Sequence, residues 1–481
     1  MTKSVYRQIY KEILGDVTAG RLSPGAKLSS ERNLCEKHKV SITSVRKALE
    51  LLCNEGIIEK RHGSGNYIKD LKSQKEIGLL VGSLFHKRVF SRFIENINSC
   101  QDGFKIKLFV ANAKMERLDS FAIKQILAKN NMPFLILTDR NFSDMAKQEI
   151  ITPLDKLSFT AKFLDCIPDP IRSSFRGSDG VERIFKLPVF MCPTVFAINE
   201  NLAKKAGLPL EEPPQIWSDV LSWCKTFTKW RDKNDKTLFA AHLEGGKIFT
   251  TNLSYYLMAS GNFSSSCDEV DAEGMKELVC FFSELYENGY ARNGEASSPD
   301  AFVSGKYLLN LSARSWIPTE MDKYNPSMKC MLLPMPAANK MGSSKSAVGS
   351  IGFGIAPNGK MDNIEVCAKA METIFSSKAL PELAYKMGIV PANLAHFRDM
   401  IKLHPEFQPF YDTLPCYCQE PDSEKNTRIV HETDYCLSRK LMLNDFDTDE
   451  AVDRIRQMIS HACQFEKSSL TNIKIKHEVP A

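Results

Sequence analysis

Three neighbouring stretches decide the fold of the amino-terminal part: Leu28-Ser29-Ser30-Glu31-Arg32, Val40-Ser41-Ile42-Thr43-Ser44-Val45-Arg46-Lys47-Ala48-Leu49, and Arg61-His62-Gly63-Ser64-Gly65. The first two begin with hydroxyl side chains that can cap helices, and the short segment 38–40 between them predicts the tight joint of a helix-turn-helix. The third places glycines between β-like runs at residues 57–61 and 66–68, which is typical of a hairpin. The three stretches therefore predict two helices followed by a β-hairpin wing.

Apolar residues recur at helical spacing within these stretches and before them. A first helix, ended by Gly20 and the turn at residues 23–25, is predicted to bury one stripe. The expected core residues are Val5, Ile9, Ile13 and Val17 in the first helix, Leu34 and Cys35 in the second, and Val45, Ala48, Leu49 and Leu52 in the third. This pattern predicts a compact three-helix head.

Positive charge is concentrated in the first 75 residues. The chain has 481 residues, with 63 Lys and Arg against 58 Asp and Glu and a formal net charge of +5. Residues 1–75 hold 15 of the basic and 8 of the acidic residues, so their net charge is +7 and that of the remainder is −2. Because Lys and Arg neutralise phosphates in nucleic-acid binding, we expect a polyanion partner for this module, a role that double-stranded DNA can fill.

The outer face of the third helix carries the candidate DNA contacts. In a helix that lies in the major groove, the amino end and the outer face meet the bases, here at Ile42, Thr43, Ser44, Arg46 and Lys47. The planar fork of the Arg46 side chain can bond guanine O6 and N7 or a phosphate. A solvated face is the alternative for any single amphipathic helix. The localised charge and the hairpin favour DNA binding.

Residues 23–34 (SPGAKLSSERNL), 40–49 (VSITSVRKAL) and 55–68 (EGIIEKRHGSGNYI) resemble the GntR family of winged helix-turn-helix transcription regulators. The resemblance covers residues 4–68 and implies binding to a DNA operator. The DNA-binding candidates are Arg32, Ser41, Thr43, Ser44, Arg46, His62 and Gly63, by match to the family, and Lys47, from its place on the helix. The family usually has Arg where this chain has Ile42, so a contact is lost or is replaced by apolar contact with a thymine methyl.

A polar, charged segment separates this head from an α/β body. We assign residues 1–70 to the head, 71–76 to a linker and 77–481 to an effector domain. Strand-like runs at residues 77–81, 106–110 and 134–137 alternate with helical patterns, which predicts a mostly parallel sheet. Ligands bind beyond the carboxyl ends of such strands, so Asp139 and Arg140 are candidate contacts, although Asp139 can equally bond to its own turn.

Residues 184–190 (IFKLPVF), 194–208 (TVFAINENLAKKAGL) and 213–221 (PPQIWSDVL) resemble the cluster 1 (type 2) extracellular solute-binding proteins. Later segments at 302–309, 332–336, 349–355 and 387–391 fit as well, and the diffuse resemblance spans most of residues 77–465. It implies two α/β lobes, with the chain crossing between them more than once, that close on a sugar or oligosaccharide. Joined to a DNA-binding head, such a body implies a sensor.

Aromatic rings stack on sugar faces, and Asp, Glu, Arg and Asn bond hydroxyl groups. The ligand-binding candidates follow strand-like runs or lie in loops near the family-like segments: Asp139, Arg140, Phe190, Glu244, Tyr255, Arg314 and Trp316. Tyr256 is an alternative to Tyr255, because the two point to different faces of a helix. Trp217, in contrast, is predicted to pack the start of a helix.

The sequence holds no recognised catalytic pattern. It lacks Gly-x-Ser-x-Gly, a phosphate-binding Gly-rich loop with Lys, and His-Glu-x-x-His, and residues 349–354 have the wrong glycine order for a dinucleotide fingerprint. Cys416 and Cys418, with His431 and Cys436 downstream, do not have a zinc spacing. Some regulators with this head carry an aminotransferase-like body that binds pyridoxal phosphate, but nothing here resembles its Schiff-base lysine context. We therefore expect no enzyme, no cofactor and no metal.

The expected function is a DNA-binding transcription regulator whose operator affinity is controlled by a small solute. A homodimer on a two-fold operator is expected, since two heads spaced one helical turn apart gain specificity. No signal-like or 18-residue apolar stretch occurs, which predicts a cytoplasmic protein with no membrane partner. The alternatives are a LacI-like type 1 sensor, which the segments around Trp217 and Pro391 disfavour, and a carbohydrate-binding protein without regulatory output.

Overall fold

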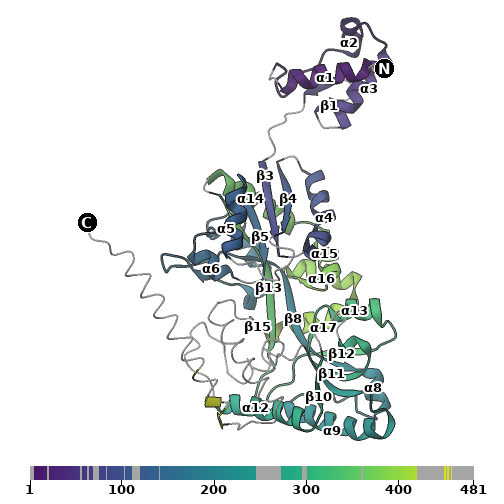
Figure 1. Ribbon diagram of the computed structural model, residues 1–481, viewed down its shortest axis with the longest axis vertical. Helices are drawn as coiled ribbons and strands as arrows, with labels where there is room; N and C mark the ends of the chain where they lie inside the picture. Colours follow the sequence, from purple (N-terminus) through teal and green to yellow (C-terminus); the bar gives the residue numbers. More distant parts are fainter. Residues whose placement is uncertain are drawn as a thin grey trace, which may run out of the picture. The chain divides into compact units, whose positions relative to one another are not determined.

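The chain forms two compact units, shown as a computed structural model in Figure 1. The first comprises Met1–Lys75 with Asp102–Lys105, and the second comprises Glu76–Gln101 with Ile106–Ala481. The structure describes residues 5–18, 21–54, 57–61, 64–68, 75–82, 84–101, 103–110, 120–139, 141–244, 272–294, 301–358 and 361–419, together with 449, 450, 452, 453 and 457. The first unit is called the head and the second the body.

The head is a winged helix-turn-helix. It consists of α1 (Val5–Thr18), α2 (Glu31–His38), α3 (Ile42–Asn54), β1 (Ile58–Arg61) and β2 (Gly65–Ile68). Its core holds Ile9, Ile13, Leu28, Leu34, Val45, Ala48, Leu49, Leu52, Ile57, Ile58 and Ile68. The predicted face of the third helix is confirmed.

The predicted stripe of α1 is confirmed only in its middle. Ile9 and Ile13 are buried, but Val5 is 43% exposed and Val17 is only partly buried. Val5 is the first residue of α1, one turn before Ile9, the first buried residue of this helix.

The joint between α2 and α3 uses the predicted caps. The Ser30 hydroxyl accepts a hydrogen bond from the Asn33 amide at 3.2 Å, and α2 ends at Lys39 in the left-handed conformation (φ 53°). The Ser41 hydroxyl then accepts a bond from the Ser44 amide at 3.4 Å. Because these side chains satisfy the free amides of the next helix start, α3 can begin three residues after Lys39.

The wing is a small antiparallel sheet fixed to the chain before α2. β1 pairs with β2. The Leu28 amide donates to the Asn66 carbonyl at 2.8 Å, and the Ile68 amide donates to the Ala26 carbonyl at 2.8 Å. Through these bonds, the segment before α2 pairs with β2 as a third extended segment. The helix-turn-helix and the wing therefore form one structural unit.

The body is built on a mixed sheet with eleven strands among the described residues. Its main order is β10-β9-β11-β8-β13-β5-β3-β4, with β12 and β14 also paired to β8 and β15 paired to β13. The strands are β3 (Lys75–Val81), β4 (Phe104–Val110), β5 (Phe134–Thr138), β8 (Leu187–Asn199), β9 (Phe239–Glu244), β10 (Ala291–Gly294), β11 (Tyr307–Arg314), β12 (Cys330–Leu333), β13 (Ser346–Ala356), β14 (Val390–Pro391) and β15 (Tyr417–Gln419). A separate pair is formed by β6 (Phe175–Arg176) and β7 (Glu182–Arg183).

Two long strands, β8 and β13, divide the sheet into two lobes and lie side by side at its centre (Figure 1). One end of the β8–β13 pair joins β5, and β3 and β4 follow; these strands form the β5 lobe. The carboxyl-terminal half of β8 joins β11 and β12, with β9 and β10 beyond; these strands form the β11 lobe. Each lobe therefore shares β8 and β13 with the other.

Each lobe has its own hydrophobic core. In the β5 lobe, Leu80 and Phe134 pack with Phe142 and Phe185. In the β11 lobe, residues of β8, β9 and β11 pack against the helices α9 and α12. The body helices are α4 (Leu84–Ser99), α5 (Ser120–Lys129), α6 (Phe142–Lys147), α7 (Thr160–Leu164), α8 (Glu200–Lys205), α9 (Trp217–Asn234), α12 (Ala272–Glu287), α13 (Ile317–Tyr324), α14 (Met361–Phe375), α15 (Leu380–Met387), α16 (Leu394–Leu403) and α17 (Gln408–Asp412).

The prediction of a mostly parallel sheet is wrong at the centre. The pairs β3–β5, β9–β11, β9–β10 and β13–β15 are parallel, but β8 is antiparallel to β11, β12, β13 and β14, and β13 is antiparallel to β5. Every residue of β8 except Cys192 is buried. Burial on both faces removes the apolar–polar alternation that usually marks an antiparallel strand.

Trp217 has the structural role that the sequence predicted. Its side chain is 4% exposed at the start of α9, and its indole Nε1 donates to the Pro336 carbonyl at 3.2 Å. The ring also stacks on Phe281, with 5.0 Å between ring centroids. Trp217 thus joins α9 to α12 in the core of the β11 lobe.

Candidate functional site

The amino end of α3 presents polar and cationic side chains to solvent. Thr43, Arg46 and Lys47 are exposed, and Ser44 is half-buried with its hydroxyl 3.1 Å from that of Ser41. The opposite face of the same helix lies in the core. This arrangement leaves the predicted DNA contacts of α3 accessible in the head.

Arg46 is held in place by a carboxylate from the preceding helix. Its Nε donates to Glu31 Oε2 at 2.8 Å, while the Arg46 side chain remains 63% exposed. A guanidinium has five N–H donors, so this bond leaves others available to a base or a phosphate. Arg32 lies one residue further along α2 and pairs with Glu36 at 3.3 Å, with 88% of its side chain exposed.

Lys47 makes a contact that the sequence did not indicate. Its ammonium lies 4.8 Å from the centroid of the Tyr6 ring in α1, which is a cation–π geometry. Lys47 therefore packs α3 against α1 as well as adding positive charge to the outer face of α3.

A second cationic cluster surrounds Tyr67 in the wing. The Arg61 guanidinium lies 4.3 Å and the Lys27 ammonium 5.8 Å from the ring centroid, and the Tyr67 and Ser64 hydroxyls are 2.7 Å apart. The hydrogen bond with Ser64, then the charges of Lys27 and Arg61, lower the pKa of Tyr67. Sequence reasoning missed this cluster, although its two cations flank the predicted hairpin. The predicted wing-tip residues His62 and Gly63 lie outside the described residues.

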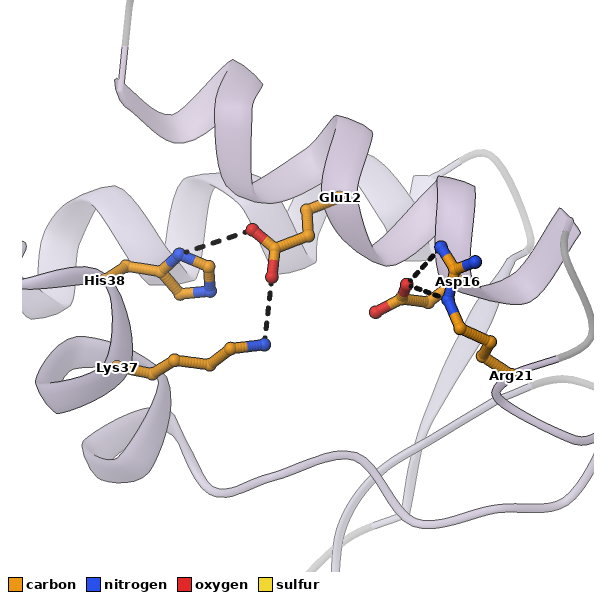
Figure 2. A network of polar contacts seen from close by, with 5 residues as sticks. All are labelled: Glu12, Asp16, Arg21, Lys37 and His38. Carbon is orange, nitrogen blue, oxygen red and sulfur yellow. Dashed lines mark hydrogen bonds and ion pairs between the residues drawn. The ribbon is translucent and has the colours of Figure 1, made fainter.

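Other basic residues of the head are paired with carboxylates of α1 (Figure 2). Glu12 contacts both Lys37, at 2.9 Å, and His38, at 3.7 Å. The hydrogen bond from Lys37 to Glu12 raises the pKa of that lysine. At the end of α1, Asp16 pairs with Arg21 at 2.7 Å. These ion pairs tie α1 to neighbouring segments of the head.

The candidate solute-binding residues of the body do not all fall in one place. Asp139 is exposed directly after β5, Arg314 is half-buried at the end of β11, and Trp316 is half-buried immediately before α13. Glu244 is the last residue of β9, but its side chain lies outside the described residues. Arg140, Tyr255 and Tyr256 also lie outside them.

Phe190 is a core residue, which corrects the expectation that it contacts a ligand. Its side chain is fully buried, and its ring meets that of Phe90 edge-on at 6.3 Å. A ring without exposed surface cannot stack on a sugar in this arrangement. The aromatic side chain was a misleading signal because β8 is buried on both faces.

The segment before α13 is anchored to the turn that precedes β14. The buried Ser315 hydroxyl donates to the Gly388 carbonyl at 3.0 Å, and it lies 3.7 Å from Cys192 Sγ of β8. Gly388 has φ +65°, and a Cβ there would lie 2.7 Å from Trp316 Cβ. Ser315, directly before Trp316, therefore lies beside the middle of β8, the strand that both lobes share.

Asp139 follows β5 and Arg314 ends β11, and these two strands join the shared β8–β13 pair from its two sides. Thr138, just before Asp139, is in register with Gly352 of β13 and so with Pro188 of β8, whereas Arg314 is in register with Thr194. Thr138 is thus six positions of extended strand from Arg314, and Asp139 lies nearer, level with Ile351 and Phe190, so the two rows are about 13–20 Å apart. The two residues thus lie in different lobes and do not form one contact point.

Among the described residues, no group of three or more His, Cys, Asp or Glu side chains has an arrangement that could hold a metal ion. Cys416 and Cys418 are described, whereas His431 and Cys436 lie outside that part of the chain. No helix in the described part is both long and apolar enough to cross a membrane.

A winged helix-turn-helix joined to a two-lobed α/β body defines a DNA-binding module combined with a solute-binding fold. Residues 5–68 match the family described as bacterial regulatory proteins, gntR family, and residues 101–408 match the family described as bacterial extracellular solute-binding protein. The chain belongs to this solute-binding protein family and carries a GntR-type head. The recognition of both families and the fold class predicted from the sequence are confirmed.

Curated relatives are similar to this chain over only part of its length. The uncharacterized HTH-type transcriptional regulator YurK of Bacillus subtilis is 35% identical over 92 residues, which cover 19% of this chain and 35% of that protein. The mannosyl-D-glycerate transport/metabolism system repressor MngR of Escherichia coli is 33% identical over 93 residues, covering 19% and 38%. The chain thus spans little more than a third of the length of these relatives.

Solved structures similar to this chain cover the body and show its fold. The cyclic alpha-maltosyl-1,6-maltose binding protein of Arthrobacter globiformis has a TM-score of 0.63 at 15% identity, covering 81% of this chain and 99% of that one. The sugar-binding protein MalE of Xanthomonas citri has a TM-score of 0.65 at 13% identity, covering 82% and 99%. UgpB of Mycobacterium tuberculosis, solved with glycerophosphocholine, has a TM-score of 0.63 at 15% identity, covering 82% and 99%. These structures show that the body has a solute-binding fold.

Proposed function

We propose that this chain is a one-component transcription regulator that binds a DNA operator through its head and is controlled by a small solute bound by its body. One observation carries the proposal: the amino end of α3 exposes Thr43, Arg46 and Lys47 in a GntR-type head that shares a chain with a solute-binding fold. The proposed site of action is the cytoplasm, and the proposed functional form is a homodimer on a two-fold operator.

The proposed DNA interface combines α3 with the start of α2 and the wing. α3 enters the major groove, while the wing contacts the flanking phosphates. The residues assigned to DNA are Arg32, Ser41, Thr43, Ser44, Arg46, Lys47, His62 and Gly63. Arg46 is given the leading role because Glu31 fixes its guanidinium while most of the side chain remains exposed.

The proposed effector is a sugar or oligosaccharide bound between the two lobes. The sugar-binding proteins with this fold, and a repressor relative named for mannosyl-D-glycerate metabolism, support a carbohydrate. The assigned contacts are Asp139, Arg140, Glu244, Tyr255, Arg314 and Trp316.

DNA binding is tested by comparing Arg46→Ala with Arg21→Ala. Both arginines are exposed, at 63% and 66%, and both pair with one carboxylate, so each variant removes the same charge from the head. The operator is first selected by the full-length protein from a random duplex library. Arg46→Ala is expected to weaken operator binding by about 1–3 kcal/mol. Arg21→Ala should change it by less than about 0.5 kcal/mol. Equal operator affinities of the two variants would show that α3 does not bind in the major groove.

Solute binding is tested by thermal unfolding of the full chain against maltooligosaccharides, other sugars and glycerophosphocholine. A solute that binds only the folded body raises the melting temperature of that unit. Asp139→Asn should reduce the shift, while Asp165→Asn, at another exposed aspartate of the body, should not. If none of these solutes raised the melting temperature, the sensor part of the proposal would fail. A shift with glycerophosphocholine alone would replace the carbohydrate assignment.

Regulation is separated from mere carbohydrate binding by linkage. A solute that controls the head must change operator affinity, and the operator must change solute affinity by the same factor. We therefore expect the identified solute to alter operator affinity of the wild-type chain at least fivefold, or about 1 kcal/mol. An unchanged operator affinity at saturating solute would favour a carbohydrate-binding protein without regulatory output.

A further inference from the structure

The first residue of α3, Ile42, presents an apolar side chain to solvent. It is 46% exposed, although the adjacent exposed positions on this helix are Thr43, Arg46 and Lys47. Ile42 is one of few large hydrophobic side chains that are exposed among the described residues. Its position at the amino end of the proposed DNA-contacting helix makes this exposure relevant to base recognition.

Packing within the head does not account for an isoleucine at this position. A helix start is often stabilised by an apolar pair between the residue before the N-cap and the fourth helical residue. Here these positions are occupied by Val40 and Val45. Val45 belongs to the head core and Val40 packs against it, whereas Ile42 does neither. Isoleucine also has a lower helix propensity than alanine, leucine or lysine. Neither core packing nor helix formation therefore calls for this side chain.

The position of Ile42 relative to Arg46 places it beside the bases. Residues four apart lie on the same face of a helix, about 6 Å from each other. The Arg46 guanidinium is tethered to Glu31 across the joint of the helix-turn-helix, which fixes one end of this face. Base pairs are about 3.4 Å apart along the duplex. A side chain at Ile42 therefore meets a base within about two base pairs of the one that Arg46 contacts.

We propose that Ile42 contacts the 5-methyl group of a thymine in the major groove and so determines one base of the operator. This proposal rests on the proposed function, since it needs α3 in the groove. The thymine methyl is the apolar group that the four unmodified base pairs offer in the major groove, and an isoleucine side chain has no donor or acceptor for the other edges. Contact removes apolar surface of both partners from water, which stabilises the complex with thymine over that with cytosine, adenine or guanine.

The test replaces single thymines of the selected operator by uracil. Uracil keeps the O4 acceptor and the pairing with adenine but lacks the methyl group, so each replacement removes the methyl contact alone. One thymine per half-site, within about two base pairs of the guanine or phosphate assigned to Arg46, is expected to show the effect. Its replacement should weaken binding of the full-length wild-type protein about fourfold, as expected for one buried methyl group.

The control is the same uracil series measured with Ile42→Ala. This variant should bind the thymine operator more weakly than wild type and should be insensitive to uracil at the critical position. Ile42→Val, which keeps a branched apolar side chain, should retain most of the sensitivity. Because Ile42 lies outside the core, the thermal stability of both variants should match that of wild type.

The outcomes distinguish this inference from the proposed function. If Arg46→Ala weakens operator binding but no uracil affects the wild type, the thymine contact is wrong and the proposed function stands. If uracil weakens wild type and Ile42→Ala equally, another residue contacts the methyl group and the assignment to Ile42 is wrong. If no sequence is enriched from the library, both the proposed function and this inference fail.

Discussion

Substitution of Gly388 by Ala should destabilise the body much more than an equivalent substitution elsewhere. Gly388 ends α15 with φ +65°, a conformation that L side chains rarely adopt. A Cβ at this position would lie 2.7 Å from Trp316 Cβ and 3.0 Å from Trp316 Cα. The backbone of Trp316 is held here by the hydrogen bond from Ser315 to the Gly388 carbonyl, so the clash cannot be relieved by a side-chain rotation.

The magnitude follows from two separate costs. A left-handed alanine costs about 1–2 kcal/mol relative to glycine. The overpacked contact with Trp316 adds about 1–3 kcal/mol. The matched control is Gly207→Ala, because Gly207 has φ +68° and a Cβ added there would meet no neighbouring atom within 4 Å. Gly207→Ala should thus show the backbone cost alone, and the difference between the variants should be about 1–3 kcal/mol.

Urea unfolding followed by tryptophan fluorescence measures this difference. The chain has four tryptophans, Trp217, Trp223, Trp230 and Trp316, and all belong to the body, so the signal reports that unit alone. A lower midpoint with an unchanged slope indicates a loss of stability. Equal losses in Gly388→Ala and Gly207→Ala would refute the close contact with Trp316. Addition of an identified solute would then test whether displacement of Trp316 also lowers its affinity.

Two further predictions concern the pH dependence of the body and the salt dependence of the head. Burial lowers the pKa of His242 to about 4, whereas an unfolded imidazole titrates near 6.5. As the pH falls, the unfolded state therefore takes up a proton at a higher pH than the folded state does. The free energy of unfolding should thus be about 3 kcal/mol lower at pH 4 than above pH 6.5. A flat profile of the urea midpoint between these pH values would contradict the burial of a neutral His242. Next to the wing, Lys27→Ala should reduce the slope of log affinity against log salt by about 1, as expected when one phosphate contact is lost. Anisotropy titrations from 50 to 200 mM salt measure this slope, and Lys37→Ala, which removes a cation paired with Glu12, should leave it unchanged.

The head could be predicted from the sequence because its signals are local. Ser30 and Ser41 stand directly before their helices, and the buried face of α3 repeats within thirteen residues. The cap bonds and the core positions follow from helix geometry alone. The pairing of Arg46 with Glu31 could not be predicted this way, because the two residues are fifteen positions apart and meet only when the joint folds.

The fold of the body could be predicted from the sequence, but the arrangement of its candidate ligand-binding residues could not. Residues 184–190 and 194–208 are separate segments of the family resemblance, although in the structure one strand, β8, runs across both lobes. Whether Asp139 and Arg314 approach one another depends on the register of β5, β13, β8 and β11, which is a property of the folded sheet. The contact of Ser315 with Gly388 joins residues 73 positions apart, and no local pattern marks it.

If a solute controls the head as proposed, the body must change state, and we expect the shared strands to accommodate that change. The pairing of β8 is irregular against β13 between Ile351 and Gly352, and against β11 between Asn310 and Ala313. Hinge motions are absorbed by a few residues rather than by whole strands. The part of β8 between these irregularities contains Cys192, which the Ser315–Gly388 contact adjoins. A solute that touches both lobes can favour one state only by its difference in affinity for the two, so a tenfold change in operator affinity needs about 1.4 kcal/mol of that difference.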